Sequence, residues 1–473
     1  MSGQDSTNDA APNAVEDGAA RGRAARAGAP RSSHAGWAPA SGRADPVATL
    51  LQQARTRTPQ LVPIRHGRML RSPSAFFRGA AAIMAADLRA TPATGIRVQL
   101  CGDAHLSNFG AFAAPDRSLV FDLNDFDETL PGPWEWDVKR LAASLAVAGR
   151  DRAFAAPDRA AAILAAVRAY REAMRGFAAM RTLDVWYARL DVGEQVASWS
   201  AQLSASRRRG LERSVAKARR KDSLRALDKL TVSVDGRPRI VSDPPLVVPL
   251  ADLVGDADEE RVRTKLGDLL QQYTETLQHD RRRLLSGYRP VDMAHKVVGV
   301  GSVGTRAWIV LLLGRDEADP LFLQIKEAES SVLEPFAGPG QATNQGQRVV
   351  EGQRLMQAAS DVFLGWLHAA QDLDGRPRDY YVRQLWDSKA SAPVDAMSAG
   401  ELAAYAGVCG WTLARAHART GDRFAIAAYL GASDRFDRAL LAFAETYADQ
   451  NERDHAALAR AVRSGAIEAH LDR

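Results

Sequence analysis

The sequence predicts an α+β fold of two lobes that is rich in helix and contains a small antiparallel sheet. Apolar residues with helical spacing occupy long stretches of the chain, for example at 138–148, 160–180 and 402–419. Two blocks, at residues 96–123 and 296–326, instead show short apolar strands separated by turn residues. Because each block also carries clustered acidic residues or glycines, we expect both blocks to contribute to function.

The composition is that of a globular protein, with 46% hydrophobic and 25% charged residues in a chain of 473. The 62 basic and 57 acidic residues are mixed along the chain, so nucleic acid is not an expected partner. The basic stretch at 207–221 is interpreted as the solvated face of a helix. Two cysteines cannot form a disulfide framework or a Cys-type zinc site. No run approaches the roughly 20 apolar residues of a membrane helix, and a cytoplasmic location is expected.

The chain divides into five segments by composition and pattern. Residues 1–46 are rich in small and polar residues and are expected to form a disordered tail. Residues 47–150 hold the acidic block, and 151–290 are expected to be a mainly helical insertion. Residues 291–390 hold the glycine-containing block and the strand at 380–385, and residues 391–473 are expected to be helical.

The acidic block places carboxylates directly after apolar strands. Asp103 and Asn108 lie on one loop, and Asp122, Asp125 and Asp127 lie on the returning strand of a predicted hairpin or just beyond it. Oxygen donors without a His or Cys cluster suit Mg²⁺ rather than zinc. An Asp and an Asn on one loop, with a further Asp beyond a hairpin, is the set that phosphoryl transfer requires.

The glycine-containing block reads Gly299-Val-Gly301-Ser302-Val-Gly304 and is followed by a strand. A dinucleotide-binding fingerprint would be followed by a helix, so this context favours a glycine-rich hairpin over bound phosphates. The next strand ends with Lys326, one of only 8 lysines in an arginine-rich chain. Glu351, in the following predicted helix, is the expected ion-pair partner of Lys326, and Glu327, Glu329 and Glu334 are alternatives.

The string Gly102-Asp-Ala-His-Leu-Ser-Asn108 resembles the catalytic loop of aminoglycoside phosphotransferases and choline kinases. The resemblance implies that Asp103 is the catalytic base, that Asn108 and Asp125 bind the metal, and that Asp137 is a structural anchor. Asp122 competes with Asp125, because it lies fourteen residues after Asn108 and so matches the usual spacing better. Asp125-Phe-Asp127 in turn resembles the Asp-Phe-Gly signature of protein kinases. Cys101 departs from the family, which usually has His there.

In kinases the glycine loop precedes the catalytic loop, whereas here it follows by nearly 200 residues. A circular permutation of a two-lobed, protein-kinase-like fold would reconcile the order. The predicted helix at 402–419 resembles the one that normally leads into the catalytic loop, and the helix at 74–89 is an alternative. The chain also resembles an uncharacterised bacterial family, domain of unknown function 2252. The resemblance is carried by motifs at residues 65–69, 72–79, 124–129 and 139–144.

These resemblances imply a kinase-like phosphotransferase that uses ATP and Mg²⁺ and acts on an unknown small-molecule or protein acceptor. Nucleotidyl transfer and a nucleotide-binding pseudokinase are the alternatives. A metallophosphoesterase is disfavoured, because its further histidine motifs are absent from the sequence. Arg65, Arg68 and Arg78, shortly before the acidic loop, either contact an acidic or phosphorylated acceptor or are ordinary surface arginines.

Overall fold

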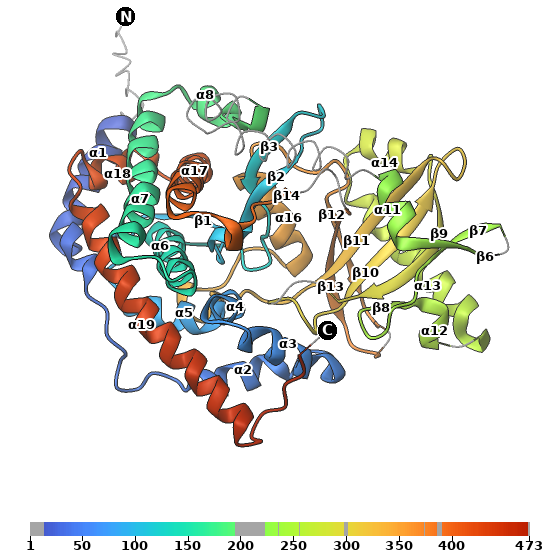
Figure 1. Ribbon diagram of the computed structural model, residues 1–473. Helices are drawn as coiled ribbons and strands as arrows, with labels where there is room; N and C mark the ends of the chain where they lie inside the picture. The colour runs from blue at the N-terminus through green and yellow to red at the C-terminus, as the bar shows by residue number, and fades with distance from the viewer. Residues whose placement is uncertain are drawn as a thin grey trace, which may run out of the picture.

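The computed structural model describes residues 14–193, 223–234, 236–254, 256–297, 301–372, 374–385 and 390–471. Helix accounts for 53% and strand for 17%, which confirms the expected α+β composition. Figure 1 shows two parts, a mass of helices on one side and an antiparallel sheet with its own helices on the other. Within the described ranges, no helix is both long enough and apolar enough to cross a bilayer.

Six antiparallel strands form the large sheet, in the spatial order β12-β13-β11-β10-β9-β8. Every residue of the central strands β10 and β11 is buried, because helices cover both faces. Val310 and Leu312 of β10 pack on the side of α13, whereas Ile309 and Leu311 pack on the side of α11. The bounds are β8 (Val247–Pro249), β9 (Arg289–Lys296), β10 (Ala307–Leu313), β11 (Pro320–Ala328), β12 (Gly365–Ala369), β13 (Arg378–Gln384), α11 (Ser223–Leu230), α12 (Leu250–Val254), α13 (Asp256–Glu275) and α14 (His279–Leu285).

The segment 151–290, expected to be a mainly helical insertion, is divided between the two parts. Helices α7 (Ala156–Ala179) and α8 (Thr182–Tyr187) pack against the helical mass. In contrast, α11, α12, α13 and α14 flank the large sheet, β8 extends it, and the hairpin of β6 (Thr231–Val234) and β7 (Arg237–Ile240) lies beside it. The basic stretch at 207–221, and most of the helix expected around it, lie outside the described residues.

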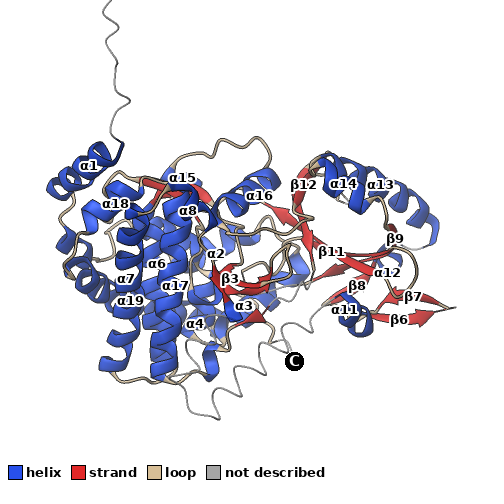
Figure 2. Ribbon diagram, turned by 90° about the horizontal axis from the view of Figure 1, so that it is seen from above, coloured by secondary structure: helices blue, strands red, loops and turns tan. Residues whose placement is uncertain are grey.

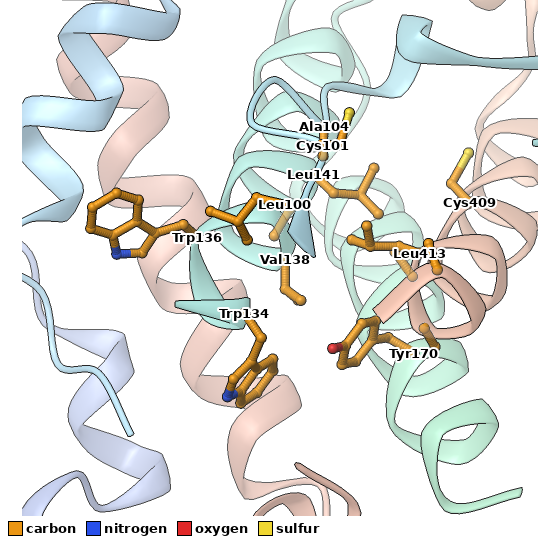
Figure 3. Packing of buried hydrophobic residues seen from close by; sticks show 14 of the residues in the cluster. Leu100, Cys101, Ala104, Trp134, Trp136, Val138, Leu141, Tyr170, Cys409 and Leu413 are labelled. Carbon is orange, nitrogen blue, oxygen red and sulfur yellow. The ribbon is translucent and has the colours of Figure 1, made fainter. Parts of the chain in front are cut away.

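The helical part is built around α6 (Trp134–Asp151), which is buried over almost its whole length. It is surrounded by α7, α17 (Ala399–Thr420) and α19 (Arg435–Arg463). Trp134 stacks on Tyr170 of α7 with 5.7 Å between ring centroids, and both rings are visible in Figure 3. Helices α7 and α17 approach closely, because a Cβ atom at Gly410 would lie only 2.0 Å from the carbonyl oxygen of Ala166.

The expectation of a disordered tail over residues 1–46 is wrong from residue 14 onward. Helix α1 (Ala14–Gly28) packs on α18 (Arg423–Leu430), and a Cβ atom at Gly22 would meet the carbonyl oxygen of Ala425 at 2.0 Å. The buried ring of His34 follows in the 3₁₀ turn Arg31–Ala35 and contacts the Tyr429 hydroxyl at 2.7 Å. The small residues of this segment therefore permit close helix packing.

Short elements that carry the acidic block lie between the helical part and the large sheet, as Figure 2 shows for β3. The expected hairpin is present as β2 (Phe109–Ala113) and β3 (Leu119–Leu123), flanked by β14 (Ala390–Ser391) and β5 (Leu190–Asp191). Strand β1 (Arg97–Leu100) pairs with β4 (Leu130–Pro133). The remaining helices are α2 (Pro46–Ala54), α3 (Val62–Leu70), α4 (Pro73–Gly79), α5 (Ala81–Leu88), α15 (Glu334–Ala337) and α16 (Gln345–Met356).

Candidate functional site

A cavity of about 720 Å³ with several charged side chains in its wall lies where the short central elements meet the large sheet. The acidic block contributes Asp103, Asn108, Asp125 and Asp127 to its wall. The glycine-containing loop contributes residues 301, 302 and 305, and residues between 44 and 86 form a third wall. Segments nearly 200 residues apart in the chain therefore line one cavity.

The loop that carries Asp103 is held by Asp137, at the start of α6. The backbone N–H groups of Cys101 and Gly102 donate to the two Asp137 carboxylate oxygens at 2.7 and 3.0 Å. Gly102 has φ +85°, and a Cβ atom there would lie 2.2 Å from the carbonyl oxygen of Glu128. The buried Cys101 thiol donates to the Asp125 carbonyl oxygen at 3.2 Å. These contacts fix the loop against the turn that carries Asp125, and Asp137 lies where an anchor was expected.

Asp103 is oriented toward the cavity by Arg140, a residue that the sequence did not single out. The Arg140 Nε and Nη2 atoms lie 2.7 and 2.6 Å from the same Asp103 carboxylate oxygen, Oδ1. The other oxygen, Oδ2, lies 3.6 Å from Nε2 of His105. Burial lowers the pKa of His105 to about 4, although Asp103 opposes the shift, so this imidazole is neutral at pH 7. Asn108 closes the loop by donating from Nδ2 to the Asp103 carbonyl oxygen at 2.6 Å.

Lys326 of β11 joins the sheet to the acidic block. Its Nζ atom lies 2.7 Å from Oδ2 of Asp127 and 3.7 Å from Oδ1 of Asp125. Burial alone would lower the pKa of Lys326, but the two carboxylates outweigh burial and raise it, so the side chain is charged. The Tyr381 hydroxyl donates to the other Asp127 oxygen at 2.6 Å. Lys326 is thus a buried cation held by two carboxylates.

The expected ion pair between Lys326 and Glu351 is wrong. Glu351 lies on an exposed face of α16, where it accepts a hydrogen bond from Gln347 at 2.7 Å. The alternative Glu327 is buried and pairs with Arg378 and Arg306. Asp127 takes the position instead, because the turn after β3 lies directly against the end of β11.

Asp122, the competing metal ligand, is absent from the cavity wall. It is 1% exposed and pairs with Arg415 of α17, which is equally buried. Its carboxylate also accepts from the backbone N–H groups of Leu123 and Ala358 at 2.9 and 2.8 Å. A carboxylate surrounded in this way holds the hairpin to α17, and its position does not suit a metal ligand. Of the two candidates, only Asp125 lines the cavity.

The described part of the glycine-containing loop covers one side of the cavity. Gly301 and Ser302 line it, and the Ser302 hydroxyl donates to Asp127 at 3.3 Å. Gly304 has φ +90°, and the Arg57 side chain packs against it. Arg57 donates from Nη1 to the Val303 carbonyl oxygen at 2.5 Å. Gly299, expected to take part in the same loop, lies outside the described residues.

The donors around the cavity fit one kind of metal site. Among the described residues, no three His, Cys, Asp or Glu side chains form a group that would hold a metal ion by themselves. Asn108 and Asp125 offer oxygen atoms only, and both line the cavity. Mg²⁺ commonly takes one or two carboxylates and completes its shell with water and substrate phosphates. The donor set is therefore compatible with Mg²⁺ bound together with a phosphorylated ligand.

The fold and the cavity define an α+β protein of two parts with a carboxylate-rich site between them. The chain belongs to the family described as "Uncharacterized protein conserved in bacteria (DUF2252)", which it matches over residues 57–461. The match covers most of the chain and confirms the bacterial family that the sequence motifs indicated. Comparison with curated proteins and with solved structures gave no match.

Proposed function

We propose that the chain is an ATP- and Mg²⁺-dependent phosphotransferase with a kinase-like arrangement of its two parts. One observation carries the proposal: Lys326 of the large sheet lies 2.7 Å from Asp127 and 3.7 Å from Asp125, and these two carboxylates line one cavity together with Asp103 and Asn108. Phosphoryl transfer in kinases uses three parts of this kind: a lysine on a strand, a turn with a metal-binding Asp, and a loop with a catalytic Asp and an Asn.

The order of elements in the sheet supports the same reading. Strands β9 and β10 flank the glycine-containing loop, and Lys326 follows on β11, the third strand counted from β9. Helix α16 follows after the short helix α15. Protein kinases likewise carry a glycine-rich loop, a lysine on the third strand and then a helix. The chain departs from kinases in one respect, because a carboxylate of the acidic block, rather than one on the helix, pairs with the lysine.

Contacts of α17 support a circular permutation. The Thr420 hydroxyl at its end accepts from the backbone N–H of Gln99 at 3.3 Å. A Cβ atom at the next residue, Gly421, would lie 2.4 Å from a methyl carbon of Val98. The helix that resembles the one leading into a kinase catalytic loop thus ends beside the strand that enters this loop. In the proposed fold, the circular permutation would have separated the end of α17 from the start of β1, which follow one another directly in the usual kinase order.

Each side chain takes a role that its position allows. Bound ATP and Mg²⁺ would supply the transferable phosphoryl group and neutralise its charge. Asp103, held through Oδ1 by Arg140, would accept the proton of the acceptor hydroxyl at Oδ2 as the new O–P bond forms and the bond to ADP breaks. Asn108 and Asp125 would hold the metal, while Lys326, Gly301 and Ser302 would position the phosphates.

Calorimetric titration of ATP, with and without Mg²⁺, tests the proposal. Wild type should bind ATP in a Mg²⁺-dependent manner, and Lys326→Ala and Asp125→Ala should both lose this binding. Glu351→Gln is the matched control and should bind as wild type does, because Glu351 is exposed and does not contact Lys326. ATP binding that ignores both site variants would refute the shared site.

A nucleotide-binding pseudokinase is the second candidate, and a specific contact favours it. Lys326 is already ion-paired with Asp127 and Asp125. Such a closed set of charges suits a site that binds a nucleotide without turning it over. Transfer of phosphate from labelled ATP separates the two candidates. Phosphotransfer in wild type that falls by roughly 100-fold or more in Asp103→Asn supports general-base catalysis. Tight Mg²⁺–ATP binding without transfer or hydrolysis would favour the pseudokinase.

A further inference from the structure

Three arginines line the cavity wall formed by the segment before the acidic loop: Arg57, Arg65 and Arg78. Arg65, on α3, is only 1% exposed, yet it faces the cavity. It donates from Nη2 to the Gly79 carbonyl oxygen at 2.9 Å. Within the described residues its Nε and Nη1 atoms have no hydrogen-bond partner. A buried guanidinium with two unused donors is costly to fold, so a ligand is expected there.

The carboxylates near this wall, Glu329 and Glu128 among them, form no ion pair with the three arginines in the described part of the chain. Among the residues that the structure describes, no carboxylate lies within ion-pair distance of Arg57, Arg65 or Arg78. Burial lowers the pKa of Arg57, and the charges of Glu329 and Glu128 oppose the shift. Burial and the charge of Arg57 lower the pKa of Arg65, and the charge of Glu329 opposes the shift. The wall therefore combines guanidinium groups that have no close ion pair with N–H donors that have no hydrogen-bond partner among the described residues.

The wall that carries the three arginines is linked to Asp103, the proposed base, rather than to Lys326. Arg140, which holds Asp103, also donates from Nη2 to the Phe77 carbonyl oxygen at 2.8 Å, directly before Arg78. Lys326 approaches the cavity from β11, with Asp125 and Asp127 around it. A group bound by the arginines would thus lie beside Asp103, where an acceptor hydroxyl must be placed.

We propose that Arg57, Arg65 and Arg78 bind an anionic group, a phosphate or a carboxylate, carried by the acceptor substrate. The assignment to the acceptor rests on the phosphotransferase proposed above. Guanidinium groups suit this task, because their fork of donors matches the oxygens of phosphate and carboxylate. The acceptor would then be an acidic or already phosphorylated compound with a hydroxyl group near that anion.

Inorganic phosphate is the probe, titrated by calorimetry at constant ionic strength. Wild type should bind it, and Arg65→Gln and Arg78→Gln should each weaken binding at least about tenfold, the loss expected for one charged hydrogen bond. Arg89→Gln is the control, because Arg89 is exposed at the end of α5 and absent from the cavity wall. Arg78 is also exposed, so its replacement leaves the fold intact even if the buried Arg65→Gln variant unfolds. Phosphate binding that is absent in wild type, or unchanged in Arg78→Gln, would overturn the proposal.

Repeating the titration in saturating Mg²⁺–ATP separates the two possible sources of the anion. Phosphate that still binds beside the nucleotide supports an acceptor group. Phosphate displaced by ATP assigns the arginines to the nucleotide and overturns the acceptor assignment. If ATP does not bind but phosphate binding still depends on Arg65 and Arg78, the anion site stands, while the phosphotransferase and the acceptor assignment both fall.

Discussion

The ion pair between Asp122 and Arg415 gives Asp122 a structural role, and Arg415→Met tests this role. The Arg415 guanidinium reaches both Asp122 and the Met356 carbonyl oxygen, the latter at 2.7 Å. Both side chains are only 1% exposed, so the substitution leaves a buried carboxylate without its cation. Breaking a buried pair in this way costs about 3–5 kcal/mol. At about 2–4 °C per kcal/mol for a domain of 150–250 residues, the melting temperature should fall by at least about 6 °C.

The pH dependence of this loss provides a second signature. Burial raises the pKa of Asp122, and Arg415 opposes the shift. Without Arg415 the pKa in the folded state rises further above its usual value of about 3.9, so the folded state holds the proton longer than the unfolded state. The stability of Arg415→Met should therefore decrease as the pH rises above that value. The difference from wild type should be smallest in acid.

Thermal unfolding by circular dichroism measures both effects, and ATP calorimetry below the transition supplies the functional comparison. Asp122→Asn should also lose stability, because it leaves Arg415 unpaired, yet it should keep Mg²⁺-dependent ATP binding. Asp125→Asn should show the reverse, with stability near that of wild type and the Mg²⁺ dependence lost. An Asp122→Asn variant with unchanged melting and no Mg²⁺ dependence would refute the structural role.

Two further predictions concern the N-terminal segment and the Asp103 loop. Burial lowers the pKa of His34 to about 3. Between pH 6.5 and 3, therefore, the unfolded state takes up a proton at His34 and the folded state does not. The free energy of unfolding should fall with decreasing pH in this window by up to about 1.4 kcal/mol per pH unit. His34→Phe should remove part of that slope in melting curves, and an unchanged slope would contradict the assignment. Gly102→Ala should lower the melting temperature and disturb the loop, because its Cβ atom would lie 2.2 Å from the Glu128 carbonyl oxygen. Gly95→Ala is its control, with φ +78° but no atom within 4 Å of the new Cβ, and equal melting losses in the two variants would show that the contact is unimportant.

The local patterns of the sequence were sufficient to find the parts of the site. Apolar strands followed by Asp103, Asn108 and Asp125, and a glycine loop followed by a strand with Lys326, are signals that lie within a few residues of one another. The structure brings Asp103, Asn108 and Asp125 to one cavity, and it places the buried Lys326 3.7 Å from Asp125. Such signals arise because strand ends and tight turns impose their own residue types on the chain.

Pairings between distant segments could not be predicted in the same way. Glu351 was expected beside Lys326 because both follow the kinase order, yet the cation is reached from the other block by Asp127. A lysine ammonium pairs with any carboxylate that lies within a few ångströms, so spacing along the chain does not identify the partner. Arg140 was missed for a related reason, since its contact with Asp103 depends on how α6 lies against the loop.

Helix α17 shows why the two candidate metal ligands could be separated only by the fold. Arg415 neutralises Asp122, and two residues later His417 lies 3.3 Å from the carboxylate of Asp137, the anchor of the Asp103 loop. These partners are 293 and 280 residues apart in the chain. One helix thus removes Asp122 from the set of possible metal ligands and supports the loop that presents Asp103. Because both contacts come from α17, displacing this helix should disturb the hairpin and the loop together. The geometry of the proposed catalytic loop therefore depends on a helix that lies beyond both sequence motifs.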